Sequence, residues 1–159
     1  MSAGHGLSDR EDAGPVFRPV PPAGDALPEL WRFPDGLEGF AGQEVFRLWR
    51  RVPESALGVL HPRQRPQEGL LLGEICALGC AAPLSLSPAE HGLLGGAGAE
   101  RLAFFLCLGA VPEMPEQAQL RVCGVLAVAL DSGLALRLSL PQRLPERLDM
   151  ARAAAAVLR

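Results

Sequence analysis

The feature that most constrains the fold of this chain is the apolar stretch of residues 124–140, which reads GVLAVALDSGLALRLSL. Its first half is apolar at nearly every position, and its second half alternates leucine with alanine, arginine and serine. A period of two is typical of a half-buried strand, and the intervening Asp131-Ser-Gly133 suits a turn with a left-handed glycine. The stretch therefore predicts a β-hairpin. The inward side of its second strand is formed by four leucines: Leu134, Leu136, Leu138 and Leu140.

A membrane helix over the same residues is disfavoured, because it would place Asp131 near the middle of the bilayer with Arg121 and Arg137 close by. A charged side chain at the centre of a membrane helix costs about 2.5–3.5 kcal/mol, and each leucine offsets only a fraction of that. The N-terminal sequence MSAGHGLSDREDAG also lacks the charged-then-apolar pattern of a signal peptide. We therefore expect an intracellular protein that is not secreted and has no membrane span.

Other segments extend the predicted fold. The continuous apolar run of residues 101–111 suits a central strand covered on both faces, and residues 69–87 contain two short strands. Residues 43–52 are predicted to be helical, because Val45, Phe46, Leu48, Trp49 and Val52 include the i, i+3, i+4, i+7 pattern of one buried face. An alanine-rich helix is predicted to begin at Pro145. Ser87, Pro88 and Glu90 form a capping box for a further short helix.

These elements predict the organisation of all 159 residues. Residues 1–28, rich in proline and glycine, form a disordered tail, and residues 29–159 form a single α+β domain. In that domain a mainly antiparallel sheet is packed by the helix of residues 43–52 and by the C-terminal helix.

Composition excludes several kinds of chemistry. All 15 basic residues are arginine, so neither a lysine Schiff base nor the lysine of a phosphate-binding P-loop is available. Tyrosine is absent too. Glu90 and His91 precede a glycine-rich loop, but no G-x-S-x-G motif accompanies them, and Ser87 is explained as a helix cap. Four cysteines lie in apolar runs, so we expect buried thiols rather than a zinc site: Cys76, Cys80, Cys107 and Cys123. We predict a protein that is not an enzyme and holds no metal or cofactor.

The two tryptophans, Trp31 and Trp49, are predicted to anchor the core. The alternative is an exposed patch for a protein partner, built from both tryptophans with Arg47, Arg50 and Arg51, because aromatic residues and arginine are enriched at interfaces. The loop of residues 61–69 makes this part of the chain locally basic. Nucleic-acid binding is a weaker alternative, because no aromatic residues interleave with these arginines as stacking platforms.

The segments EGLLLGEICALG and RVCGVLAVALDSGLALRLSL, the proline-rich N-terminus and the composition of a GC-rich genome resemble the small nuclear accessory family of alphaherpesviruses. The resemblance covers about half the chain and carries no functional residue. It implies a non-catalytic viral accessory protein that acts through protein–protein contacts, in the host nucleus or cytoplasm or in the virion tegument. The alternative is a bacterial secretion chaperone, which an α+β fold and a pI near 5.6 also fit.

Overall fold

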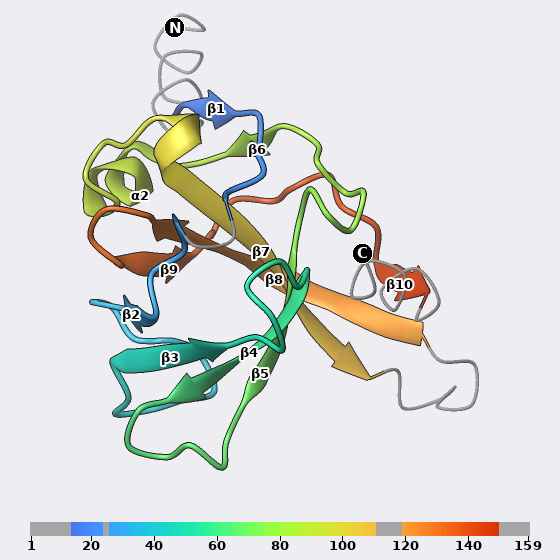
Figure 1. The fold of residues 1–159 in the computed structure, drawn as a ribbon. Coiled ribbons are helices and arrows are strands. Elements are labelled where there is room, and N and C mark those ends of the chain that lie inside the picture. The colour runs from blue at the N-terminus through green and yellow to red at the C-terminus, as the bar shows by residue number, and fades with distance from the viewer. Residues whose placement is uncertain (1–13, 24–25, 111–118, 150–159) are drawn as a thin grey trace, which may run out of the picture.

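The computed structural model describes residues 14–23, 26–110 and 119–149 of the chain. Strands dominate these residues (Figure 1). The strands are β1 (Val16–Phe17), β2 (Leu30–Arg32), β3 (Val45–Trp49), β4 (Leu57–Pro62), β5 (Leu70–Glu74), β6 (Leu84–Ser85), β7 (Leu102–Ala110), β8 (Gln119–Ala129), β9 (Ala135–Arg137) and β10 (Arg147–Asp149). The described residues contain a single α-helix, α2 (Pro88–Leu93), and a 3₁₀ turn at Ala99–Arg101 leads into β7.

The main sheet is antiparallel and curls until its ends nearly meet. Its strand order is β10-β8-β7-β5-β4-β3-β2. The short strand β9 pairs with residues 126–128 of β8, at the other end of that strand from β10, which pairs with residues 119–121. The curl is closed at one point, where the N–H of Arg32 in β2 donates to the carbonyl of Gly133 over 2.8 Å. A parallel bridge joins Arg32 to Leu134 at the same place. The sheet is therefore a nearly closed barrel.

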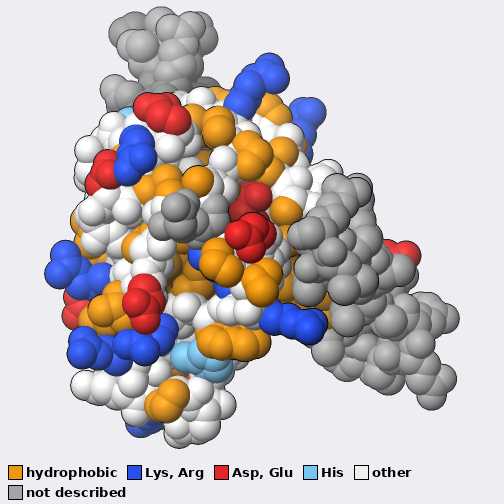
Figure 2. Space-filling model, in the orientation of Figure 1, with side chains coloured by type: hydrophobic (Ala, Val, Ile, Leu, Met, Phe, Trp, Pro, Cys, Tyr) orange, Lys and Arg blue, Asp and Glu red, His pale blue; other side chains and the backbone are white. Residues whose placement is uncertain are grey.

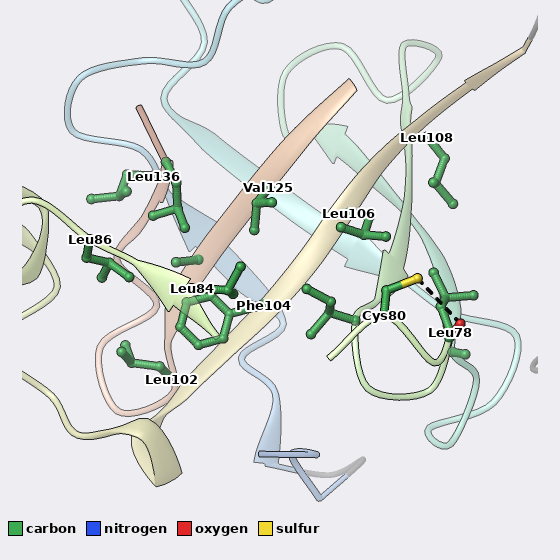
Figure 3. Packing of buried hydrophobic residues seen from close by; sticks show 14 of the residues in the cluster. Leu78, Cys80, Leu84, Leu86, Leu102, Phe104, Leu106, Leu108, Val125 and Leu136 are labelled. Atoms are coloured by element: carbon green, nitrogen blue, oxygen red, sulfur yellow. Dashed lines mark hydrogen bonds between the residues drawn. The ribbon is translucent and has the colours of Figure 1, made fainter. Parts of the chain in front are cut away.

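Alternating residues of the sheet feed two separate cores. The inner core fills the barrel and includes Trp31, Phe46 and Phe105. The outer core covers the opposite face of β7 and β8, and includes Phe104 and Leu106 (Figure 3). Its second layer is formed by the loop that follows β5, by β6 and α2, and by the chain that follows β9. Because β7 is buried on both faces, its continuous apolar sequence is explained, and the central strand predicted for residues 101–111 is confirmed.

The predicted hairpin of residues 124–140 is confirmed in outline. β8 and β9 are antiparallel neighbours, and Gly133 has a φ of 76° in the turn between them. Leu136 and Leu138 are buried together in the outer core, but Leu134 and Leu140 are only half-buried. Ala135 is buried in the inner core instead. The second strand is therefore covered on both sides, and the residues just before it, Gly133 and Leu134, close the barrel against β2.

The predicted helix of residues 43–52 is wrong, because Val45–Trp49 form strand β3. Periodicity does not settle so short a segment, because Phe46 and Leu48 also have the spacing of a strand. The structure uses the period of two, with Phe46 and Leu48 buried and Arg47 and Trp49 exposed. The neighbouring strands β2 and β4 satisfy its backbone hydrogen-bonding groups.

The C-terminal helix is wrong over its first described residues, since Arg147–Asp149 form β10 against β8. Residues 150–159 of that predicted helix lie outside the described part of the chain. The α+β fold class is therefore wrong as well. Strands, loops and the six-residue helix α2 provide the packing that two longer helices were expected to provide.

The capping box of α2 is confirmed. The Ser87 hydroxyl accepts from the Glu90 N–H over 3.1 Å, and the Glu90 carboxylate accepts from the Ser87 N–H over 2.8 Å. The second oxygen of the same buried carboxylate accepts from the N–H of Ser139 over 2.7 Å, which ties α2 to the chain after β9. The division into a tail of residues 1–28 and a domain of residues 29–159 stays a prediction. Within that tail, Val16–Phe17 pair with β6.

Candidate functional site

The described residues cover the outer face of the barrel over β7 and β8 but leave it uncovered over β2, β3 and β4. Register places Arg47 of β3 between Leu30 of β2 and His61 of β4, and Trp49 opposite Val59. Paired residues of antiparallel strands point to the same side of the sheet. We call this surface the open face, and its outward residues are Leu30, Arg32, Arg47, Trp49, Val59 and His61. In Figure 2, blue and orange side chains lie close together beside a pale-blue histidine in this region.

Trp49 is the most prominent apolar residue of the open face, with 56% of its surface exposed. It stands between two hollows. The first, of about 450 Å³, has mostly apolar walls and is lined by Arg47, Trp49, His61, Pro62, Arg63 and Pro66. We call it the Pro66 hollow. The second, of about 290 Å³, is lined by Leu27, Pro28, Glu29, Leu48, Trp49, Arg50, Arg51, Val52 and Pro53, and is called the Pro53 hollow.

A third hollow, of about 510 Å³, adjoins the Pro66 hollow through Arg63. Residues 42–45 and Gln64 form the rest of its lining, so it contains no aromatic side chain. It lacks the combination of an exposed aromatic ring and several cations that surrounds Trp49. We therefore place the candidate site at Trp49.

The charges around Trp49 are mainly positive. Arg47 makes one solvent-exposed ion pair, with Glu29 at 3.6 Å. Arg50 donates to the carbonyl of Pro53, and partial burial lowers the pKa of its guanidinium although Glu54 opposes that shift. The side chains of Arg51 and Arg63 make no hydrogen bond or ion pair with the described residues. The chain carries a net charge of −3, so this surface differs in sign from the protein as a whole.

The predicted partner-binding residues separate into two groups. Trp31 is fully buried, packs on Phe105 with ring centroids 5.2 Å apart, and donates from Nε1 to the carbonyl of Pro28 over 2.9 Å. Trp31 therefore anchors the core, as predicted, and is not accessible to a protein partner. Arg47, Trp49, Arg50 and Arg51 all lie at the open face or its border. For Trp49 the core-anchor prediction is wrong.

The sequence did not identify Val59, His61, Pro62 and Pro66 as members of the site. The only signal was the locally basic composition of residues 61–69, which has no strand period. The pairing of β3 with β4 brings this loop to Trp49, because Phe46 and Arg47 are opposite Pro62 and His61.

His91, the residue considered for acid–base catalysis, makes structural contacts. The Nε2 of His91 is bonded to the carbonyl of Ala97 over 2.9 Å, and its ring lies 5.2 Å from Phe17. No group of three or more metal-ligating side chains occurs among the residues the structure describes.

The four cysteines differ in exposure. Cys80 and Cys107 are buried and Cys76 is partly buried, but Cys123 is exposed, so the expectation of four buried thiols is wrong for Cys123. Burial raises the pKa of both Cys76 and Cys107 to about 12.

The exposure of Cys123 has a local cause. Strand β8 pairs Gly124 with Cys107 and Val122 with Leu108, so Cys123 is an extra residue without an opposite partner in β7. This β-bulge turns its side chain outward.

The fold and the open face define a nearly closed antiparallel barrel with one covered and one uncovered outer surface. Among solved structures, the chain is similar to the crystal structure of the flagellar assembly factor FliW, with a TM-score of 0.63 and 15% sequence identity. The likeness covers 77% of this chain and 85% of that one, and at this identity it establishes the fold alone.

Comparison with protein-family models and with curated proteins found no match. Within the described residues, no helix has the length and apolar content to cross a membrane.

Proposed function

We propose that this protein is a non-catalytic binding protein that holds a protein partner on the open face around Trp49. The observation that carries the proposal is the 56% exposure of that side chain between two hollows. Exposed tryptophan is disfavoured in water, and tryptophan flanked by arginine is the composition typical of interface hot spots. On the covered outer face, by contrast, the same chain buries its apolar side chains under a second layer.

The likeness to an assembly factor favours the chaperone-like alternative over the viral accessory reading. Under this proposal the protein accompanies a partner during its assembly and does not alter it chemically. A chaperone of the secretion type is expected to be a dimer, which light scattering on the purified protein tests. The alphaherpesvirus resemblance and the intracellular location stay predictions.

The proposal is tested with three forms of the full chain: wild type, Trp49→Ala and Leu93→Ala. Leu93 is also an exposed apolar residue, but it lies on α2, away from the open face. Each form is used to capture partners from the source cells, and each captured protein is then purified and tested alone for binding. We expect one purified partner that binds wild type and Leu93→Ala and loses at least about tenfold in affinity for Trp49→Ala.

Equal binding of that partner to all three forms would place the interface elsewhere and contradict the proposal. Turnover of a small molecule by the purified protein would contradict its non-catalytic part.

A further inference from the structure

We infer that the open face takes an acidic, extended peptide segment of the partner, with an apolar side chain seated beside Trp49. This inference rests on the proposed function and names the chemistry of the partner. It follows from the linear order of charges along β3, from the shape of the Pro66 hollow and from the single exposed aromatic ring.

Cations lie at both ends of β3 with Trp49 between them. Arg63 is beside the start of the strand, because its N–H donates to the carbonyl of Val45 over 2.9 Å. Arg51 follows Trp49 by two residues, at the other end. An extended chain rises about 3.3 Å per residue, so the distance from Val45 to Arg51 matches a segment of about six residues.

The charges at these two ends are unsatisfied within the described residues. Four arginines and one glutamate line the Pro66 and Pro53 hollows, and the glutamate, Glu29, already pairs with Arg47. Arg51 and Arg63 have no side-chain partner there. Carboxylates at the two ends of a bound segment would complement them, and complementary charge sets the register and speeds association.

The Pro66 hollow supplies the apolar part of the site. Its mostly apolar walls, which include Trp49, Pro62 and Pro66, suit a leucine or phenylalanine side chain, and its volume of about 450 Å³ is more than enough to hold one. A flat charged surface would bind an acidic segment without fixing its position. The hollow beside the ring gives the segment an anchor.

A peptide fits this surface better than a single-stranded nucleic acid. Nucleic-acid channels align several aromatic rings on which successive bases stack. Trp49 is the only strongly exposed aromatic side chain among the described residues. The nearby His61 is half-buried, and its Nδ1 is bonded to the carbonyl of Glu68 over 2.8 Å.

The test selects binders from a display library of random eight-residue peptides on the full-length protein. Parallel selections use Trp49→Ala and the control Leu93→Ala, each first checked for a wild-type unfolding transition. We expect enriched peptides with acidic residues on both sides of a leucine or phenylalanine, obtained with wild type and Leu93→Ala and lost with Trp49→Ala.

One enriched peptide is then synthesised and its Kd measured by fluorescence anisotropy. Arg51→Glu and Arg63→Glu should each raise that Kd about tenfold, and added salt should weaken binding to wild type more than to either variant. Arg143→Glu makes the same charge change at an exposed residue outside both hollows and should leave the Kd unchanged.

The outcomes separate the two proposals. Peptides that require Trp49 but lack acidic residues overturn the inference and leave the proposed function standing. Peptides that bind Trp49→Ala as well as wild type contradict both. No enrichment on wild type, or tighter binding of an eight-nucleotide single-stranded RNA than of any selected peptide, also overturns the inference.

Discussion

The covered face over β7 and β8 and the open face over β3 and β4 are two parts of the same curled sheet. On the covered face the outward side chains are apolar, as with Phe104, Leu106 and Val125, and the chain folds back over them. On the open face the outward side chains include Arg47, Trp49 and His61, and no layer covers them within the described residues. A tryptophan left exposed by a chain that covers its other apolar face indicates a surface suited to another molecule.

The covering layer is also held by buried carboxylates. Glu74, at the end of β5, accepts from the N–H groups of Cys76 and Ala77 over 2.7 and 3.1 Å. Glu90 joins α2 to the chain after β9. Both connections pack over the outer core. Among the described residues, the open face has no buried carboxylate of this kind and presents cations instead. The comparison predicts large stability effects on the first face and small ones on the second.

Phe104→Ala should have the largest effect, because the side chain is almost fully buried in the outer core. A buried phenylalanine truncated to alanine costs about 3–5 kcal/mol, through lost burial and the cavity left behind. Chemical denaturation of the purified protein measures the free energy of unfolding. A loss below about 1 kcal/mol would show that the covering layer collapses into the cavity left by the phenyl ring. The two faces would then differ less in their contribution to stability than the structure indicates.

Gly133→Ala should follow, because a Cβ at this position would lie 2.7 Å from the carbonyl oxygen of Leu30. The left-handed backbone alone costs a non-glycine residue about 1–2 kcal/mol. Gly36→Ala is the matched control, since Gly36 has a φ of 77° but open space around it. The difference between the two variants in unfolding free energy isolates the clash at the barrel closure. Equal losses of unfolding free energy in the two variants would mean that the backbone at the barrel closure shifts to accept the Cβ without a measurable energetic cost.

Glu90→Gln should destabilise the protein by about 1–2 kcal/mol, because an amide has one oxygen where the carboxylate uses two. Ser87→Ala removes the capping contact but leaves the bond to Ser139. The larger loss in thermal unfolding should belong to Glu90→Gln. A reversed order would mean that the helix cap, rather than the tether to the chain after β9, stabilises the covering layer.

Glu74 should make stability depend on pH. Burial raises the pKa of its carboxyl above the ordinary value of 4.5, although the backbone N–H groups of Cys76 and Ala77 oppose the shift. Just above pH 4.5 the folded state keeps a proton that the unfolded state has released, so the free energy of unfolding falls as pH rises through the folded-state pKa.

The measurement is denaturant unfolding at a series of pH values for wild type, Glu74→Gln and the control Glu54→Gln. The fall should be absent from Glu74→Gln and present in Glu54→Gln, which changes an exposed carboxyl. A slope that survives in Glu74→Gln would assign the pH dependence to other groups.

Trp49→Ala should have the smallest effect on stability, within about 1 kcal/mol, because more than half of the side chain is exposed. In Trp49→Phe the fluorescence comes from Trp31 alone, which is fully buried and should be shielded from quenching by acrylamide. Wild type should be quenched more strongly. A large loss of stability in Trp49→Ala would make this residue part of the core and remove the basis of the open face.

Local sequence determined several elements of this fold. Ser87, Pro88 and Glu90 act within one turn of chain, so the capping box needs no distant partner. The hairpin turn follows from a glycine that can take a positive φ at position 133. The continuous apolar run that forms β7 requires cover on both faces wherever it lies. The cap and the turn depend on neighbours in sequence, and the apolar run depends on its own composition, which is why their prediction succeeded.

Only the tertiary structure decided the state of residues 43–52 and the place of Trp49. The apolar residues of positions 43–52 suit one face of a helix, and only Phe46 and Leu48 face inward in a strand, yet pairing with β2 and β4 selected the strand. That choice turned Trp49 outward and brought residues 61–66 beside it. The same dependence holds for β10, where pairing with β8 prevailed over local helix preference. The sequence alone determines which segments are apolar and where the chain can turn, whereas strand pairing over long separations decides which apolar side chains remain exposed for a partner.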